Sequence, residues 1–310
     1  MTGQTPVHAN ILTIDVEDWG QSAPDVYYPA LATTREMVPP TERVVTNTRR
    51  LLGVLAELGV RTTCFVLGSV AERFPGLVRE IAAAGHEVAS HGYGHRPVYA
   101  QTPEAFREDV RRSLDALQDA LGHPVRGYRA PYFSITRQSQ WALPILAELG
   151  FAFDASLFPC HPFYYRFPGW RGWPHAERYP HVLNVGGRLL HEVPTTTVSV
   201  LGQHLPFAGG AYLRFLPLGF FRQAVREANG HGYPAVLYLH PHDLDWEELR
   251  QPVPGENLRI RFLRWFLNAG RTRNEGRLRS LLEGYSFATI GEWLADRRAP
   301  VEAAALRVKA

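Results

Sequence analysis

The chain has 310 residues, of which 45% are hydrophobic and 20% charged, the composition of a soluble globular protein. Its 33 basic and 30 acidic residues give a formal net charge of only +3 without a long basic block, so nucleic-acid binding is not expected. No secretory signal pattern opens the sequence, and its longest uncharged stretch, 193–213, is interrupted by polar residues, prolines and glycines. These features predict a cytoplasmic protein without a transmembrane segment, near a membrane only through its substrate.

The first half of the chain alternates between short apolar strands and amphipathic helices. A β-branched run at 11–16 predicts a buried strand that ends in acids, and a long loop follows over 20–40. Apolar residues at helical spacing predict a helix with Thr41 as its N-cap and Gly59 as its stop. Further strands are predicted at 62–67 and 87–89.

Helical segments that end in glycine recur along the chain, each followed within one or two residues by a short apolar run. The clearest helix begins at Thr102-Pro103 and ends at Gly122. Strands are predicted at 125–129, 151–154, 235–240 and 286–290, and helices at 138–149, 217–229 and 257–282. The pattern predicts an α/β fold, a distorted (β/α) barrel of about seven parallel strands with loop and hairpin insertions.

Two segments interrupt this alternation. Residues 158–180 are rich in aromatic residues, proline and glycine, and could form a lid, a sugar-stacking wall or a structural plug. A hairpin insertion is expected at 190–201. Since no flexible linker divides the chain, a single domain over 1–310 is preferred. The two cysteines, Cys64 and Cys160, are expected to be buried and inert.

Ionisable residues stand where five of the predicted strands end. In a barrel of parallel strands these ends gather at one face, where catalytic residues collect. In chain order the residues are Asp15, Glu17 and Asp18, then His91 and His95, then Arg129, then Asp154, and then His240.

His91 and His95 stand four residues apart in a glycine-containing turn. Imidazoles at this spacing can bind one divalent cation, and one carboxylate would complete a catalytic site with positions open for water. Glu17 could be the carboxylate ligand if the first strand stays extended, with Asp15 on the same face as a base. Asp18 becomes the ligand if the chain turns there, and the sequence leaves both open.

Arg129 and His240 could complete such a site. Arg129 could orient a carboxylate such as Asp15. His240 closes an apolar run and precedes Pro241, so it should lie at the barrel mouth as a general acid. Taken singly, each residue would more often be structural or solvent-exposed.

Five motifs in this order resemble the polysaccharide deacetylase family of the NodB-homology type (carbohydrate esterase family 4), whose fold is a distorted (β/α) barrel. They are Thr13-Ile14-Asp15-Val16-Glu17-Asp18, His91-Gly92-Tyr93-Gly94-His95, Arg129-Ala130-Pro131-Tyr132, Asp154-Ala155-Ser156 and Leu239-His240. The resemblance covers about 9–297. Stretches at 209–214, 238–241 and 266–271 further resemble the bacterial subgroup associated with exosortase (PEP-CTERM) exopolysaccharide loci, with a family-specific part over about 160–297.

The resemblance implies a metal-dependent hydrolase that removes the N-acetyl group from amino sugars of a glycan or glycan precursor. Asp15 would be the base and His240 the acid, with Arg129 orienting Asp15 and Asp154 tuning His240. The expected metal ligands, for zinc or else cobalt, nickel or manganese, are His91, His95 and Glu17 or Asp18. The expected substrate-binding residues are Pro131, Tyr132 and Tyr93.

Two departures from the family pattern affect these assignments. The family's adjacent aspartates in the first motif are spread out here, and His242-Asp243 replaces an expected Trp-Glu. Three other interpretations stay open: an allantoinase-like hydrolase of a small amide, a catalytically inactive glycan-binding barrel, and a glycosidase that uses Asp15 and Glu17 as paired carboxylates.

Overall fold

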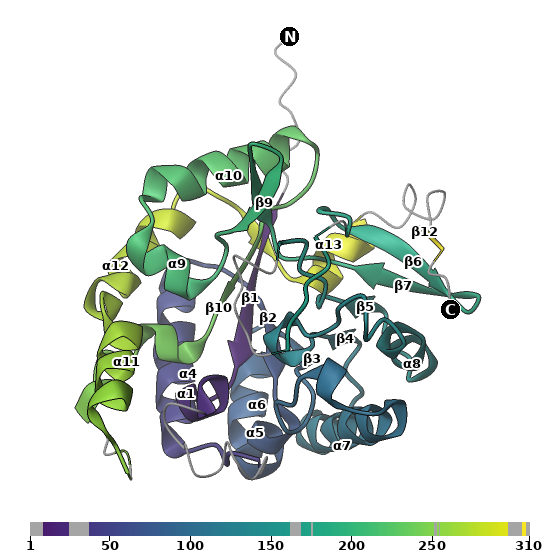
Figure 1. Cartoon of the computed structure of the whole chain (residues 1–310), viewed down its shortest axis with the longest axis horizontal. Helices are drawn as coiled ribbons and strands as arrows, with labels where there is room; N and C mark the ends of the chain where they lie inside the picture. The colour runs from purple at the N-terminus through teal and green to yellow at the C-terminus, as the bar shows by residue number, and fades with distance from the viewer. Residues whose placement is uncertain are drawn as a thin grey trace.

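A curled, mostly parallel sheet runs through the centre of the molecule (Figure 1). The computed structural model describes residues 9–24, 37–161, 169–174, 176–250, 253, 255–296 and 306–307. The strand order is β10-β1-β2-β3-β4-β5-β7-β6-β12, and β11 also pairs with β1. The strands are β1 Asn10–Val16, β2 Thr63–Val66, β3 Glu87–Ser90, β4 Gly127–Tyr128, β5 Phe153–Asp154, β6 His181–Val185, β7 Arg188–Glu192, β10 Val236–Leu239, β11 Phe287–Ala288 and β12 Leu306–Arg307.

The pairings from β10 through β7 in this order are all parallel, which confirms the predicted α/β architecture. Strand β1 is buried at every position because both faces of the central sheet are covered. Beyond β7 the chain returns toward the other end of the sheet, where the Thr196 N–H donates to the Val236 carbonyl at 3.1 Å. The sheet therefore curls into a distorted barrel.

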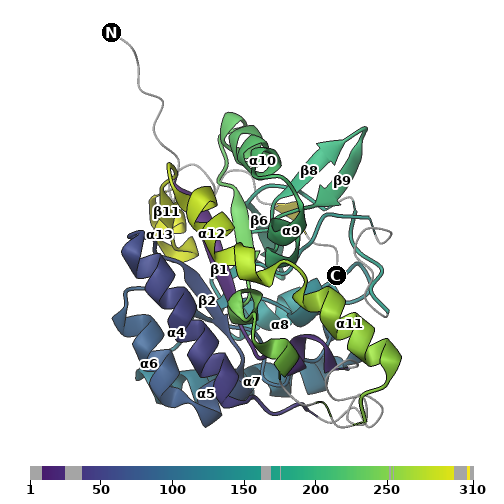
Figure 2. The same cartoon turned by 90° about the vertical axis from the view of Figure 1, so that its left-hand side faces the viewer.

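Helices cover the outside of the curled sheet (Figures 1 and 2). As predicted, Thr41 caps α4 by accepting a hydrogen bond from the Arg43 N–H, and Gly59 follows with a left-handed φ of 63°. The helices are α1 Trp19–Ser22, α4 Glu42–Glu57, α5 Gly68–Arg73, α6 Pro75–Ala83, α7 Pro103–Leu121, α8 Ala142–Glu148, α9 Gly210–Phe215, α10 Leu218–Gly230, α11 Leu258–Asn268, α12 Arg271–Leu282 and α13 Ile290–Asp296.

Two predicted boundaries are wrong. The hairpin expected at 190–201 is replaced by two antiparallel pairs, β6 with β7 and β8 (Thr197–Val200) with β9 (Gln203–Pro206). The first turns at Gly186-Gly187, where both φ angles are positive, as tight hairpin turns require. The helix expected over 257–282 divides at Gly270, whose φ of 80° ends α11 and starts α12.

The aromatic segment 158–180 is a structural plug where the structure describes it. Phe158 and Trp170 are buried in the main hydrophobic core, and the Trp170 indole N–H donates to the Phe133 carbonyl at 2.9 Å. Residues 162–168 and 175 lie outside the described residues, so the prediction of a lid or stacking wall there is not addressed.

Two composition-based predictions can be compared with the structure. Cys64 and Cys160 are free and buried, and burial raises the pKa of Cys160 to about 12, consistent with inert thiols. Within the described ranges, no helix combines the length and the apolar composition that crossing a bilayer demands.

Candidate metal and catalytic centre

A cavity of about 380 Å³ opens where β1, β3 and β10 end. It collects side chains from strand ends far apart in the sequence, as the barrel geometry predicts. Its polar lining includes Asp15, Glu17, His91, His95, Tyr132, Arg214, His240, Asp243 and Arg271.

Glu17 and the two histidines of the turn form the group best suited to hold a cation. One carboxylate oxygen of Glu17, Oε2, lies 3.6 Å from His91 Nε2 and in direct contact with His95 Nε2. Ligand atoms of the three residues all lie within 4.8 Å of one another, and all three side chains are buried. Burial opposes ionisation of Glu17, but the charges and hydrogen bonds of His95 and His91 outweigh it and hold the pKa of Glu17 well below its usual value.

The protonation of His91 fits a metal ligand. Its Nδ1 lies 2.9 Å from the carbonyl oxygen of Arg129, which can only accept, so Nδ1 carries the proton. In the neutral ring, Nε2 is then the nitrogen that keeps a lone pair for a cation, and it lies 3.6 Å from Glu17 Oε2. A divalent cation between them would satisfy both, and a carbonyl behind the ring is a common support for a ligating histidine.

The turn that carries the histidines is held from below by α7. The Asp109 carboxylate accepts hydrogen bonds from the backbone N–H groups of Tyr93, at 2.8 Å, and Gly94, at 3.2 Å. Gly92 and His95 have left-handed φ angles of 74° and 55°, so one of the two glycines and one histidine make the tight turn. Sequence analysis missed Asp109, which lies on the polar side of a helix with no motif around it.

Asp18 is not brought to this group. Its Oδ2 accepts hydrogen bonds from the backbone N–H and the hydroxyl of Thr41, at 2.7 and 2.5 Å. Its own N–H donates to the Gln21 side chain at 3.0 Å as the chain turns into α1. Of the two carboxylates left open by the sequence, Glu17 points to the histidines and Asp18 ties the loop to the start of α4.

Arg129 lies beneath the cavity and binds Asp15, as expected. Its Nη1 is 2.7 Å from Asp15 Oδ1 and 2.7 Å from Thr13 Oγ1, and its Nε donates to the Ala155 carbonyl at 3.1 Å. Both charged side chains are buried, at 0% and 3% exposure. These contacts fix the orientation of the Asp15 carboxylate at the cavity wall.

Asp154 does not contact His240 and is paired with Glu192 instead. The two residues are direct neighbours in the parallel register of β5 and β7, and both are fully buried. Burial raises the pKa of Asp154 to about 6, and burial beside Asp154 raises that of Glu192 well above its usual value. Two buried carboxyls at this closeness share a proton, because both cannot ionise together.

His240 has Asp243 as its carboxylate partner. Asp243 Oδ2 lies 3.4 Å from His240 Nδ1 and accepts a hydrogen bond from the His240 backbone N–H at 2.8 Å. The other ring nitrogen of His240, Nε2, lies 3.4 Å from Glu17 Oε1. Burial by itself lowers the pKa of His240, but Asp243 and Glu17 raise it to about 9. His242 stacks on the His240 ring at 4.7 Å between centroids. Asp243 stands at the position where the sequence departs from the family pattern.

The three predicted substrate-binding residues separate. Tyr132 lines the cavity, with its ring centroid 4.3 Å from that of His95 in an edge-to-face contact and a left-handed φ of 56°. Pro131 is buried in the short turn that carries Tyr132. Tyr93 points away from the cavity, its hydroxyl bound to Glu72 and its ring 3.8 Å from the Arg112 guanidinium. The prediction for Tyr93 is therefore corrected to a structural role.

Two family models match adjoining parts of the chain. Residues 31–153 match the model described as polysaccharide deacetylase, and residues 155–295 match a domain of unknown function, DUF3473. A peptidoglycan-N-acetylglucosamine deacetylase of Bacillus cereus is 31% identical over 96 residues, 31% of this chain and 35% of that protein. A chitooligosaccharide deacetylase of Rhizobium leguminosarum is 32% identical over 114 residues, 37% of this chain and 49% of that protein. The chain thus spans less than half the length of these curated relatives.

Solved structures share the fold along the whole chain. A Mycobacterium smegmatis protein assigned to the polysaccharide deacetylases has a TM-score of 0.62 at 22% identity, covering 99% of this chain and 96% of that one. An allantoinase has a TM-score of 0.59 at 16% identity, with 96% and 93% covered. Residues 31–153 are therefore similar to the polysaccharide deacetylase family, and the solved structures share the fold of the whole chain.

Proposed function

We propose that this protein is a metal-dependent hydrolase that removes the N-acetyl group from an amino sugar of a glycan. One observation carries the proposal: Glu17, His91 and His95 converge in a cavity that Asp15 and His240 also line. The curated relatives, named for deacetylation of peptidoglycan and chitooligosaccharide, support the choice of an N-acetylated glycan.

Glu17, His91 and His95 would hold the cation. Two imidazoles and one carboxylate suit zinc, and also cobalt, nickel and manganese. When bound, such a cation supplies positive charge that polarises an amide carbonyl and lowers the pKa of a water molecule.

Asp15 and His240 would move the protons. Asp15, oriented by Arg129, accepts a proton from the water as its oxygen attacks the acetyl carbonyl carbon. His240, oriented by Asp243, donates a proton to the sugar nitrogen as the carbon–nitrogen bond breaks. The products are acetate and a free amino sugar.

The sugar ring would be placed by the aromatic wall of the cavity, where Tyr132 lies against His95. The subgroup resemblance of the sequence supports a substrate among bacterial exopolysaccharides or their precursors. The proposed substrate is therefore an N-acetylated bacterial exopolysaccharide or its precursor.

Release of acetate by the zinc-loaded protein tests the proposal. N-acetylglucosamine oligomers and an N-acetylated exopolysaccharide should yield acetate, and Asp15→Asn and His95→Ala should each lower the rate by at least about 100-fold. His123→Ala, at an exposed histidine, is the matched control and should match the parent.

Three results would contradict the proposal. The first is an absence of acetate from every glycan, and the second is a His95→Ala variant as active as the parent. The third is glycan cleavage that survives a chelator, which would favour a glycosidase with paired carboxylates. A panel of small amides run beside the glycans would identify an amidohydrolase.

A further inference from the structure

Helix α11 lies at the edge of the molecule (Figure 2), and several of its large apolar side chains are exposed. Leu258, Phe262, Trp265 and Phe266 are 85%, 61%, 57% and 53% exposed, and their spacing puts them in one stripe. Phe215 of α9, 54% exposed, extends the stripe by stacking on Phe266 with 6.1 Å between ring centroids. We call these five residues the α11 apolar face.

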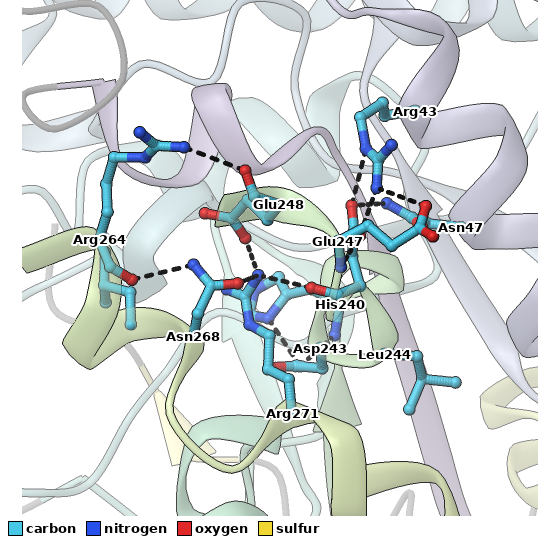
Figure 3. Close-up of polar contacts among 12 residues, drawn as sticks. Arg43, Asn47, His240, Asp243, Leu244, Glu247, Glu248, Arg264, Asn268 and Arg271 are labelled. Atoms are coloured by element: carbon cyan, nitrogen blue, oxygen red, sulfur yellow. Dashed lines mark hydrogen bonds and ion pairs between the residues drawn. The ribbon is translucent and has the colours of Figure 1, made fainter. Parts of the chain in front are cut away.

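The inner side of the same helix buries two polar residues beside Ile260. Arg264 and Asn268 are 3% and 8% exposed, and Arg264 binds Glu256 at 3.1 Å and the Glu248 carbonyl at 3.0 Å. Asn268 donates to the Arg264 carbonyl and accepts from Arg271, which also pairs with the Glu248 carboxylate (Figure 3). This network fixes the helix with its polar residues inward, so the aromatic side chains cannot turn into the core.

Two arginines flank the α11 apolar face. Arg259 and Arg261 are exposed, and at 3.6 residues per turn they project on opposite sides of the stripe. The nearest acidic residue along the chain, Glu256, is taken by the buried Arg264. The face is therefore an apolar stripe between two positive charges.

This arrangement fits a bilayer surface better than other occupants. A convex helix with Trp, Phe and Leu between arginines is typical of helices that lie among lipid headgroups, where anionic lipids meet the positive flanks. A symmetric contact with a second copy would bring like-charged arginines of both chains together, which is unfavourable. A glycan would find a convex surface with few hydrogen-bonding groups.

We infer that the α11 apolar face docks on an anionic lipid bilayer, with the helix lying in the plane of the headgroups. The face adjoins the cavity, because Arg214 and Leu267, the chain neighbours of Phe215 and Phe266, line it. Docking sets the cavity mouth beside the lipid headgroups. The inference is independent of the proposed deacetylation, and its test does not use activity.

Co-sedimentation of the full chain with vesicles tests the inference. The protein should bind vesicles that contain phosphatidylglycerol and bind phosphatidylcholine vesicles much more weakly. Arg259→Gln/Arg261→Gln should weaken anionic binding about 30-fold, from about fivefold per arginine. Phe262→Ser/Trp265→Ser should abolish it, and tryptophan quenching by brominated lipid should fall in Trp265→Phe.

Matched variants elsewhere on the surface serve as controls. Arg79→Gln/Arg111→Gln removes two exposed arginines from α6 and α7, and Leu201→Ser removes a 99% exposed leucine from the turn between β8 and β9. Both should bind like the parent, and circular dichroism should show that every variant is folded.

Several outcomes would overturn the inference. One is a parent protein that does not sediment with anionic vesicles, and another is equal loss of binding in the control variants. A dimer broken by Phe262→Ser/Trp265→Ser in a protein without vesicle binding would assign the face to a second copy. Retention on a glycan matrix that needs the face, again without vesicle binding, would assign it to a sugar.

Discussion

The buried ion pair between Arg129 and Asp15 allows a stability prediction with a magnitude. Arg129 is 0% exposed and Asp15 is 3% exposed, with 2.7 Å between Nη1 and Oδ1. The same guanidinium donates to Thr13 and to the Ala155 carbonyl, and it stacks 4.2 Å from the centre of the Phe65 ring. One side chain therefore contacts β1, β2 and the residue that follows β5.

Arg129→Met keeps most of the apolar stem of Arg129 and removes its charge and its donors. The Asp15 carboxylate would then be buried without its cation, and breaking a buried pair from one side costs about 3–5 kcal/mol of unfolding free energy. Asp15→Asn/Arg129→Met removes both charges, so it should recover a large part of that loss.

Urea unfolding at pH 7 measures these differences through the transition midpoint and its slope. Arg126→Met, at an exposed arginine three positions earlier, should change the free energy of unfolding by less than about 0.5 kcal/mol. A loss below about 1 kcal/mol in Arg129→Met, or a double variant no more stable than the single one, would refute the reasoning.

Two further substitutions test positions around the centre. A Cβ on Gly210 would overlap the Asp243 carboxylate, whereas a Cβ on Gly219 would meet nothing within 4 Å. Gly210→Ala should therefore lower the rate of acetate release by about tenfold or more, and Gly219→Ala should leave the rate unchanged. Equal rates would contradict the role of Asp243. The carboxyl groups of Asp154 and Glu192 have raised pKa values in the folded protein. The folded protein therefore keeps a proton that the unfolded chain releases above about pH 4. The free energy of unfolding should fall as the pH rises through about 6, the pKa of folded Asp154. Glu192→Gln should flatten this dependence in urea midpoints at pH 5 and 8, and an unchanged slope would contradict the shared proton.

The fold could be predicted from the sequence where the signals are local. A capping threonine, glycines with positive φ and β-branched runs each act within a few residues, and they located α4, α7 and β1. The hairpin predicted at 190–201 is misplaced because the turn is set by the glycine pair at 186–187, which lies outside that range.

Two questions about the motif residues are decided by contacts that are distant in sequence. Whether Glu17 or Asp18 faces the histidines depends on Thr41, which captures Asp18 from 23 positions away. Tyr93 lies against Glu72 and Arg112 instead of lining the cavity. Neither partner belongs to a motif, so no local pattern indicates them.

The carboxylate partner of His240 shows where the strand-end argument stops. Asp154 and His240 both lie at the ends of strands that meet one face of the barrel, but β5 and β10 are separated in the sheet by β1 to β4. Asp154 instead meets Glu192 of the adjacent β7, its direct neighbour in the parallel register. Asp243 reaches His240 because it lies three residues farther along, in the short turn that follows β10. Asp243 therefore supplies the carboxylate partner of His240 from the same loop, in place of Asp154 at the end of β5.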